Sequence, residues 1–396
     1  MTRPPLASGY RLTGISCGIK PGTQQRDLAL IVSTRPASAA GVFTQNRICA
    51  APVQVCRERL PAGDVRGVVV CAGNANACTG AQGLADARRM TELAAAALGC
   101  EPRQMLVAST GVIGRPLPMP AVEAGIAQAA AALADTPAAL DDAAHAILTT
   151  DTHAKLAGRT LALPSGTVHL TALAKGAAMI GPNLATMLAF ILSDAAVTPN
   201  DLQAILGRAA DRSFNCISVE GHTSTNDTVL LLANGPGEPL AGAALQAFAE
   251  AVEEVCIELA RAIVDDAEGA THTITLEVSG AADDAEARLI ARTIANSPLV
   301  KTAIHGADPN WGRVVSAAGY AGVPFAESEL SLWLGELPLY LAGVPQPFDP
   351  AAASAYLRAN RTVHLRLTLQ RGAGTCRFWT SDLTAEYVRL NADYTT

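Results

Sequence analysis

The chain has 396 residues and a formal net charge of −7, with no run of Lys and Arg, which argues against nucleic acid as its main partner. Hydrophobic residues make up 49% and charged residues 16%, a composition typical of a folded globular protein and not of a disordered one. A chain of this length predicts two lobes instead of a single core.

The cysteines and the apolar runs indicate the compartment. The nine cysteines contain no Cys-x-x-Cys pair, which argues against a zinc site or a disulfide framework and predicts buried free thiols. No apolar segment follows the first ten residues, as a signal peptide would require. The most apolar run, Leu184–Leu192, is far shorter than the roughly 20 residues that span a bilayer. We therefore expect a cytoplasmic protein.

The first half of the chain mixes strand and helix patterns. Apolar runs between turn residues predict strands at Leu28–Val32, Ala40–Phe43, Gly67–Cys71 and Leu106–Ser109. Helices are predicted at Asp86–Leu98 (ended by Gly99), Pro120–Ala134 and Pro137–Leu148. Thr160–Leu163 and Val168–Ala174 flank Pro164-Ser165-Gly166 and predict a hairpin.

The second half repeats this mixture without a repeat period. Strands are predicted at Thr186–Leu192, Thr228–Leu232, Thr273–Val278 and His364–Leu369. Helices are predicted at Asp201–Arg212, Ala243–Ala262 and Asp283–Ala295. Together the elements predict an α/β or α+β fold class.

The segment before Thr186 is unusual, because glycine and proline cluster directly before an apolar run. A strained approach of this kind would press the Thr186 hydroxyl against the Ala185 carbonyl. Acyl transfer to that oxygen and hydrolysis of the ester would cut the chain. The new terminal amine, with a pKa of about 7.7–8.0, would then serve as base for its own hydroxyl. From the residues alone, the simpler explanation of Thr186 is a β-former that begins a strand.

The run Lys175-Gly176 to Ala185-Thr186-Met187-Leu188 resembles the self-cleavage site of the glutamate N-acetyltransferase (ornithine acetyltransferase) family of arginine biosynthesis. The likeness covers nearly the whole chain. Further blocks similar to the family lie at 41–44, 73–80, 109–114, 149–152, 223–228, 308–313 and 391–396.

This resemblance implies a layered, two-lobed α/β fold, an αββα-like sandwich formed jointly by two self-cleaved chains. Cleavage between Ala185 and Thr186 would give an α chain of residues 1–185 and a β chain of residues 186–396. The family also implies a heterotetramer of two α and two β chains.

The resemblance also implies the roles of individual residues. Thr186 matches the nucleophile, and Thr110 with Gly111 matches the oxyanion hole, where two donors would stabilise the developing negative charge. The residues that match the family's substrate-binding positions, together with Thr186, are Thr149, Lys175, Glu268, Asn391 and Thr396. A lysine suits a substrate carboxylate, and a glutamate suits a substrate amine.

The implied reaction is a ping-pong transfer of acetyl from N-acetylornithine to glutamate through an acetyl-Thr186 intermediate. It requires no metal or cofactor. Acetyl-CoA as a second donor, which would make the enzyme bifunctional with amino-acid N-acetyltransferase activity, stays open.

Four positions depart from the family pattern. Ala178 and Ala267 stand where glycine is frequent, His222 where an acidic residue is frequent, and His272 where lysine is usual. These departures leave open a paralogue acting on a related N-acyl amino acid in secondary metabolism. Two further alternatives to the implied function are a hydrolase that uses water as acceptor and an uncut, non-enzymatic subunit.

Overall fold

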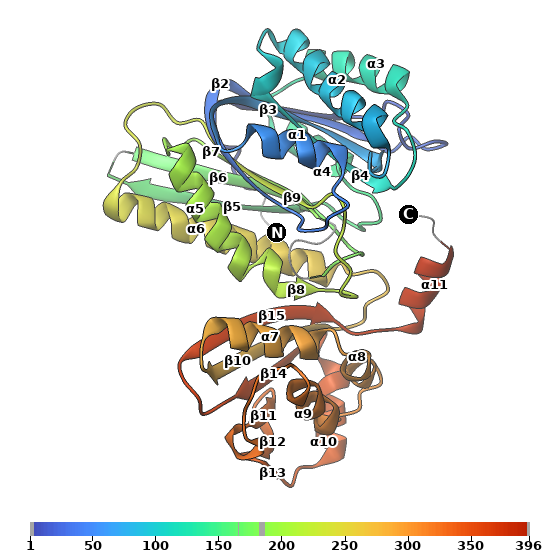
Figure 1. Ribbon diagram of the computed structural model, residues 1–396, viewed down its shortest axis with the longest axis vertical. Helices are drawn as coiled ribbons and strands as arrows, with labels where there is room; N and C mark the ends of the chain where they lie inside the picture. Colours follow the sequence, from blue (N-terminus) through green and yellow to red (C-terminus); the bar gives the residue numbers. More distant parts are fainter. Residues whose placement is uncertain (1–3, 165, 182–186, 394–396) are drawn as a thin grey trace.

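The computed structural model describes residues 4–164, 166–181 and 187–393, which form two lobes that the chain enters in turn (Figure 1). The predicted cleavage site, Ala185 and Thr186, and the predicted binding residue Thr396 lie outside these ranges. The described residues nearest to the predicted cut are Gly181 on one side and Met187 on the other.

The larger lobe is built around an eight-stranded sheet. Its strands are β1 (Tyr10–Ile15), β2 (Leu28–Phe43), β3 (Ala62–Asn74), β4 (Met105–Val112), β5 (Lys155–Leu163), β6 (Gly166–Lys175), β7 (Leu188–Ser193) and β9 (Thr228–Ala233). Its helices are α1 (Ala51–Arg59), α2 (Gly80–Leu98), α3 (Met119–Ala131), α4 (Pro137–Ala146), α5 (Pro199–Arg212) and α6 (Gly242–Asp265), with short 3-10 turns at Pro102–Gln104 and Phe214–Cys216.

The smaller lobe is built around a seven-stranded sheet. Its strands are β8 (Ile217–Ser218), β10 (Thr273–Ala281), β11 (Ser331–Leu334), β12 (Leu337–Leu341), β13 (Val344–Pro345), β14 (Thr362–Thr368) and β15 (Gly374–Ser381). Its helices are α7 (Asp284–Ala295), α8 (Pro298–His305), α9 (Trp311–Gly319) and α10 (Pro350–Ala359), with a 3-10 turn at Glu327–Glu329. The last helix, α11 (Ala385–Asp393), leaves this lobe and returns to the larger one (Figure 1).

The layers follow from the buried faces. In the larger sheet, whose order is β4-β3-β2-β9-β7-β6-β5, one face packs under α2, α3 and α4 and the other against α5 and α6. Strands buried on both faces read as continuous apolar runs, as Leu188–Leu192 and Val229–Leu232 do. Helix α6 also contacts β15 and β8, so one continuous core joins the two lobes. The layered, two-lobed α/β fold is thus confirmed.

The sheet holds both sides of the predicted cleavage site. Strands β6 and β7 are antiparallel neighbours, with Lys175 opposite Leu188, and β7 also pairs in parallel with β9. Residues 176–187 form the connection between β6 and β7. A cut within this connection would leave each new end attached to a strand in the middle of the same sheet.

Several predicted boundaries differ from the observed ones. Helix α2 begins at Gly80, before the predicted start at Asp86, because the buried Asp86 carboxylate accepts a hydrogen bond from Gln82 inside the helix instead of standing in its first turn. Strand β4 continues past Ser109 through Val112, because it pairs in parallel with β3 beyond the apolar run. The predicted strand at Thr186–Leu192 begins, within the described residues, at Leu188.

All nine cysteines are free, but the prediction that they are buried is only partly right. Cys56, Cys71, Cys216 and Cys256 are buried, whereas Cys78 is exposed. Cys78 lies at a positive φ of 58° in the turn before α2, which places its side chain outside the core.

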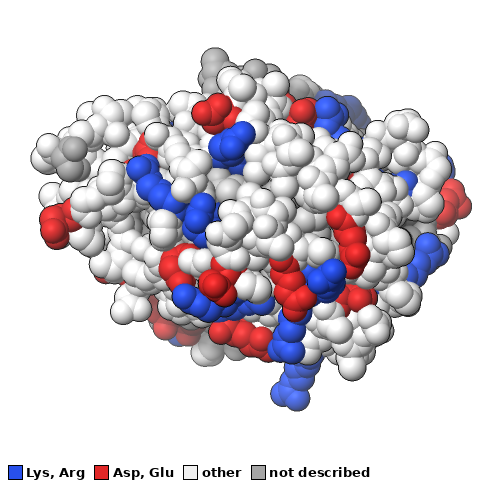
Figure 2. All heavy atoms as spheres, turned by 90° about the horizontal axis from the view of Figure 1, so that it is seen from above, with Lys and Arg blue, Asp and Glu red and all other residues white. Residues whose placement is uncertain are grey.

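Figure 2 shows the face of the larger lobe above its helical layer, where basic and acidic side chains are interspersed. In this layer Arg88 pairs with Glu58 at 3.1 Å and Arg89 with Glu123 at 3.2 Å, joining α2 to α1 and to α3. Exposed pairs of this kind contribute about 0–1 kcal/mol each, so apolar burial holds the layer in place. None of the helices that the structure describes is both long and apolar enough to cross a bilayer.

Candidate active site

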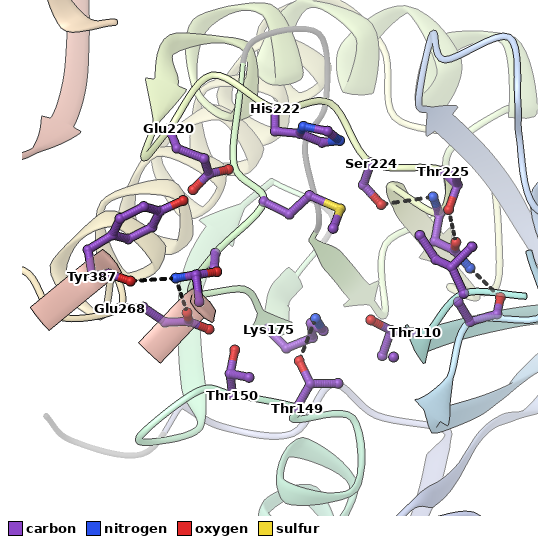
Figure 3. A pocket seen from close by; sticks show the side chains of 17 residues that line it. Thr110, Thr149, Thr150, Lys175, Glu220, His222, Ser224, Thr225, Glu268 and Tyr387 are labelled. Carbon is purple, nitrogen blue, oxygen red and sulfur yellow. Dashed lines mark hydrogen bonds between the residues drawn. The ribbon is translucent and has the colours of Figure 1, made fainter. Parts of the chain in front are cut away.

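An open pocket of about 900 Å³ lies where the ends of several elements meet. It is lined from β4 and the loops that follow β3, α4, β6, β8 and α6, and by α11 (Figure 3). Six of the predicted site residues line it: Thr110, Gly111, Thr149, Lys175, Glu268 and Asn391. Residues separated by up to two-thirds of the chain are therefore brought to one place.

The predicted oxyanion residues lie at the end of β4, where the strand opens into the pocket. Gly111 has a φ of +125°, and a Cβ there would lie 2.3 Å from the carbonyl carbon of Gly73, so only glycine fits. Asn226 ties this edge together by donating to the carbonyl oxygens of Ala75 (2.6 Å) and Ser109 (2.8 Å). The neighbouring Thr110 is thereby held rigidly at the pocket wall.

Lys175 is fully buried at the end of β6, and its Nζ donates to the hydroxyl of Thr149 at 2.9 Å. Burial lowers the pKa of Lys175, while the carboxylate of Asp151 opposes that shift. An amine with few water contacts and a hydroxyl beside it is suited to bind a carboxylate of a ligand.

A buried ion network holds Lys175 and Thr149 in place. Lys155 Nζ lies 2.7 Å from the carboxylates of both Asp151 and Asp266. Asp151 also accepts hydrogen bonds from the backbone N–H of Gly176 (2.6 Å) and of Thr149 (3.1 Å). Burial would raise the pKa of Asp151, but Lys175, Lys155 and the Gly176 N–H hold it at about 2. The loops that carry Thr149, Lys175 and Glu268 are thus joined at Lys155.

The C-terminal helix α11 completes the pocket instead of fraying. The amide of Asn391 donates to the carboxylate of Glu268 at 3.0 Å. Gly269 allows the close approach, because a Cβ there would lie 2.6 Å from the backbone nitrogen of Tyr387. Thr384 donates to the Gly269 carbonyl at 2.7 Å. Glu268 and Asn391, predicted as separate binding residues, therefore form one hydrogen-bonded unit.

Three polar residues in or beside the pocket have no role predicted from the sequence. Glu220 and Tyr387 line the pocket, and Asp227 is fully buried beside the start of β7. Asp227 belongs to the block at 223–228, and an acidic residue just before the apolar run that starts at Val229 was a usable signal. The sequence around Tyr387 does not indicate that its side chain reaches the pocket. Only the docking of α11 shows its place.

The four departures from the family pattern fall in different surroundings. Ala178 and His222 line the pocket. The buried Ala267 does not line it, and neither does His272. The Nδ1 of His272 lies 2.9 Å from Asp382 and its Nε2 lies 3.1 Å from the Leu357 carbonyl oxygen, which fixes the ring in the smaller lobe.

Within the described ranges, no group of three or more His, Cys, Asp or Glu side chains is placed to hold a metal ion. The chemistry that the pocket offers comes from hydroxyls, a buried amine, backbone N–H groups and carboxylates.

The sequence profile of the ArgJ family matches residues 11–396. The chain belongs to the ArgJ family. It is 47% identical over 409 aligned residues to the arginine biosynthesis bifunctional protein ArgJ of Thermosynechococcus vestitus, covering 98% of this chain and 97% of that relative. It is 49% identical over 396 residues to the ArgJ protein of Symbiobacterium thermophilum, with 98% and 97% covered.

A solved structure of the bifunctional ArgJ protein from Bacillus halodurans is also similar, with a TM-score of 0.51 and 40% identity over 52% of this chain and 98% of that one. Membership of the ArgJ family confirms the resemblance seen in the sequence. The chain is an enzyme of the glutamate N-acetyltransferase (ornithine acetyltransferase) type, and it carries out acetyl transfer in arginine biosynthesis.

Proposed function

We propose that the chain cuts itself between Ala185 and Thr186 and then moves acetyl from N-acetylornithine to glutamate through an acetyl-Thr186 intermediate. The observation that carries this proposal is the convergence of Thr110, Gly111, Lys175, Thr149 and Glu268 on one pocket, next to the connection that contains residue 186. The names of the relatives, which place them in arginine biosynthesis, are consistent with this reaction.

In the first step the Thr186 hydroxyl attacks the carbonyl carbon of Ala185, and the acyl group moves from nitrogen to oxygen. This shift breaks the peptide bond and frees the amine of Thr186, and water then hydrolyses the ester, which frees the hydroxyl and separates the two chains. Before the shift the nitrogen belongs to a peptide bond and cannot act as a base. The buried carboxylate of Asp227 is suited to take the hydroxyl proton. It accepts a hydrogen bond at 3.0 Å from the backbone N–H of Met187, the residue that follows Thr186.

In the transfer step Lys175 and Thr149 bind the α-carboxylate of N-acetylornithine, which directs its acetyl group toward Thr110 and Gly111. The Thr186 amine accepts the hydroxyl proton while the oxygen attacks the acetyl carbon. The Thr110 hydroxyl and the Gly111 N–H stabilise the tetrahedral oxyanion. Ornithine leaves with the proton on its nitrogen, and the α-amine of glutamate then takes the acetyl group from Thr186 by the reverse sequence.

The α chain, residues 1–185, and the β chain, residues 186–396, would stay together after cleavage, because β6 and β7 remain paired within one sheet. By analogy with the family we propose an assembly of two α and two β chains in the cytoplasm. The word bifunctional in the names of the relatives supports acetyl-CoA as a second acetyl donor to glutamate.

Two measurements test the proposal. Intact-mass analysis of the purified protein should give two chains in place of one 40.7 kDa species, and Thr186→Ala should stay uncut. Acetyl transfer to glutamate is then measured with N-acetylornithine and with acetyl-CoA in turn. An active, uncut wild-type chain would overturn self-cleavage, and release of acetate independent of glutamate would identify a hydrolase instead.

A further inference from the structure

The pocket has two ends of opposite character (Figure 3). At one end lie Thr110, Thr149 and the buried amine of Lys175. At the other end lie the carboxyl groups of Glu220 and Glu268. A ligand anchored by its α-carboxylate at Lys175 would therefore extend its side chain toward the two glutamates.

Glu220 differs from Glu268 in its partners. Glu268 is bound by Asn391, whereas neither carboxyl oxygen of the buried Glu220 makes a hydrogen bond of good geometry to a described residue, although the backbone N–H groups of Ile180 and Met179 lie near it. The backbone around Glu220 is fixed, because the N–H groups of Val219, Glu220 and Gly221 all donate to the Ile180 carbonyl, at 2.8, 3.3 and 3.1 Å. A buried carboxyl group without partners is costly unless a ligand provides one.

The charged and titratable groups around Glu220 come from several elements. Burial raises the pKa of Glu220 to about 8, and Glu268 raises it further, while Lys301 and the N–H groups of Ile180 and Met179 oppose the shift. Lys301 on α8 is itself held by the Thr380 hydroxyl at 2.9 Å and by the Ser381 carbonyl. His222 lines the same end of the pocket, and Tyr387 faces it from α11.

In the proposed reaction this end of the pocket has to bind two side chains of opposite charge. The side chain of N-acetylornithine ends in an ammonium group after three carbons, and that of glutamate ends in a carboxylate at the same reach. In a ping-pong reaction both occupy one site in turn. A permanent anion would favour the first and repel the second. A carboxyl group can serve both, because its ionised form accepts hydrogen bonds and its protonated form also donates one.

We propose that Glu220 recognises the side chains of both substrates by changing its protonation state, accepting from the ammonium group of N-acetylornithine as a carboxylate and donating to the side-chain carboxylate of glutamate as an acid. This inference rests on the proposed function. The protons balance: Glu220 releases one proton to solvent when the cationic substrate binds, and it takes one up when ornithine is replaced by glutamate. Over a full cycle no net proton is exchanged at this group.

The test compares wild type with Glu220→Gln, which keeps the shape and a neutral donor but cannot ionise. The variant should raise the KM for N-acetylornithine at least tenfold and change the KM for glutamate less than threefold, with kcat little altered. In wild type the KM for N-acetylornithine should fall, and that for glutamate rise, as pH increases through 8. Both dependences should disappear in the variant.

A binding measurement separates this inference from the proposed function, because it requires no turnover. Near pH 8, titration calorimetry in buffers of different ionisation enthalpy should show proton release when ornithine binds and proton uptake when glutamate binds. Glu220→Gln should show neither. Equal effects on both KM values, or unchanged proton exchange in the variant, would overturn the role of Glu220. Loss of acetyl transfer in wild type, with proton exchange as described, would overturn only the proposed reaction.

Discussion

The carboxylate of Asp227 accepts a hydrogen bond from the backbone N–H of Met187, with 3.0 Å between Oδ1 and the nitrogen. The side chain of Asp227 is fully buried, and its Oδ2 has no hydrogen-bond partner among the described residues. Burial raises the pKa of Asp227 to about 8, against the opposing effects of the Met187 N–H and Lys175. A carboxyl group with one oxygen that finds no partner in the described part of the chain thus contacts Met187, the second residue after the peptide bond that we propose is cut.

Replacing this group should slow self-cleavage. In Asp227→Asn the proton acceptor is lost while the shape is kept, so the uncut chain should accumulate and the cleavage rate should fall by about 10²-fold or more. A time course on denaturing gels measures this. Asp194→Asn removes a partly buried carboxylate just beyond the far end of β7 and should cleave normally. Wild-type cleavage in Asp227→Asn would exclude Asp227 as the base.

Removing one oxyanion donor should affect the rate more than binding. Thr110→Val deletes the hydroxyl at nearly constant volume, and loss of one such donor lowers kcat by about 10²–10³-fold. The KM values should change little, because the hydroxyl acts only on the charge that develops in the transition state. Thr150→Val, which changes a second threonine of the same pocket, is the control. A similar fall in both variants would show that Thr110 has no special role.

The buried lysine beneath the pocket should be essential for stability. In Lys155→Met, Asp151 and Asp266 keep their charges without the central cation, which should lower the free energy of unfolding by about 3–5 kcal/mol. Arg159→Met, on the same strand, removes the half-exposed partner of Glu254 and Glu258 and should cost about 0–1 kcal/mol. Urea unfolding in a Thr186→Ala background, where one chain unfolds, compares the two. Equal losses would contradict the network.

Stability should decrease as the pH rises from about 4.5 to about 8. The pKa of Glu220 rises from 4.5 to about 8 on folding, so between these values the folded chain binds more protons than the unfolded one. The free energy of unfolding therefore falls as pH rises through this range. Glu220→Gln should reduce the slope of the urea midpoint against pH. The exposed Glu254→Gln should leave the slope unchanged, and an unaltered slope in both would refute the assignment.

The secondary structure could be predicted where local signals were strong. The hairpin around residue 165 and helices such as Asp201–Arg212 follow from period, turn residues and capping, and the structure has them at or near the predicted bounds. The resemblance, spread over blocks at fixed positions, supplied Thr110, Gly111, Thr149, Lys175, Glu268 and Asn391 as site residues, and all of them line one pocket.

Other features required the folded chain. Strand β4 continues through Thr110 and Gly111 only because β3 offers it a partner, which no window of sequence contains. His272 follows Glu268 closely in the sequence, yet Asp382 holds its ring in the smaller lobe. Gly269, with a positive φ of 66°, lies between the two residues.

By itself, the order of residues determined the class of fold, the family and the chemical groups available, because these depend on local patterns and on motif identity. Only the tertiary structure decided which of those groups lose water and face one another. Packing buries carboxyl oxygens of Glu220 and Asp227 that find no well-formed hydrogen bond among the residues the structure describes. It also places two carboxylates beside Lys155 and brings α11 back to Glu268. The shifted pKa values that support the proposed chemistry arise from that packing.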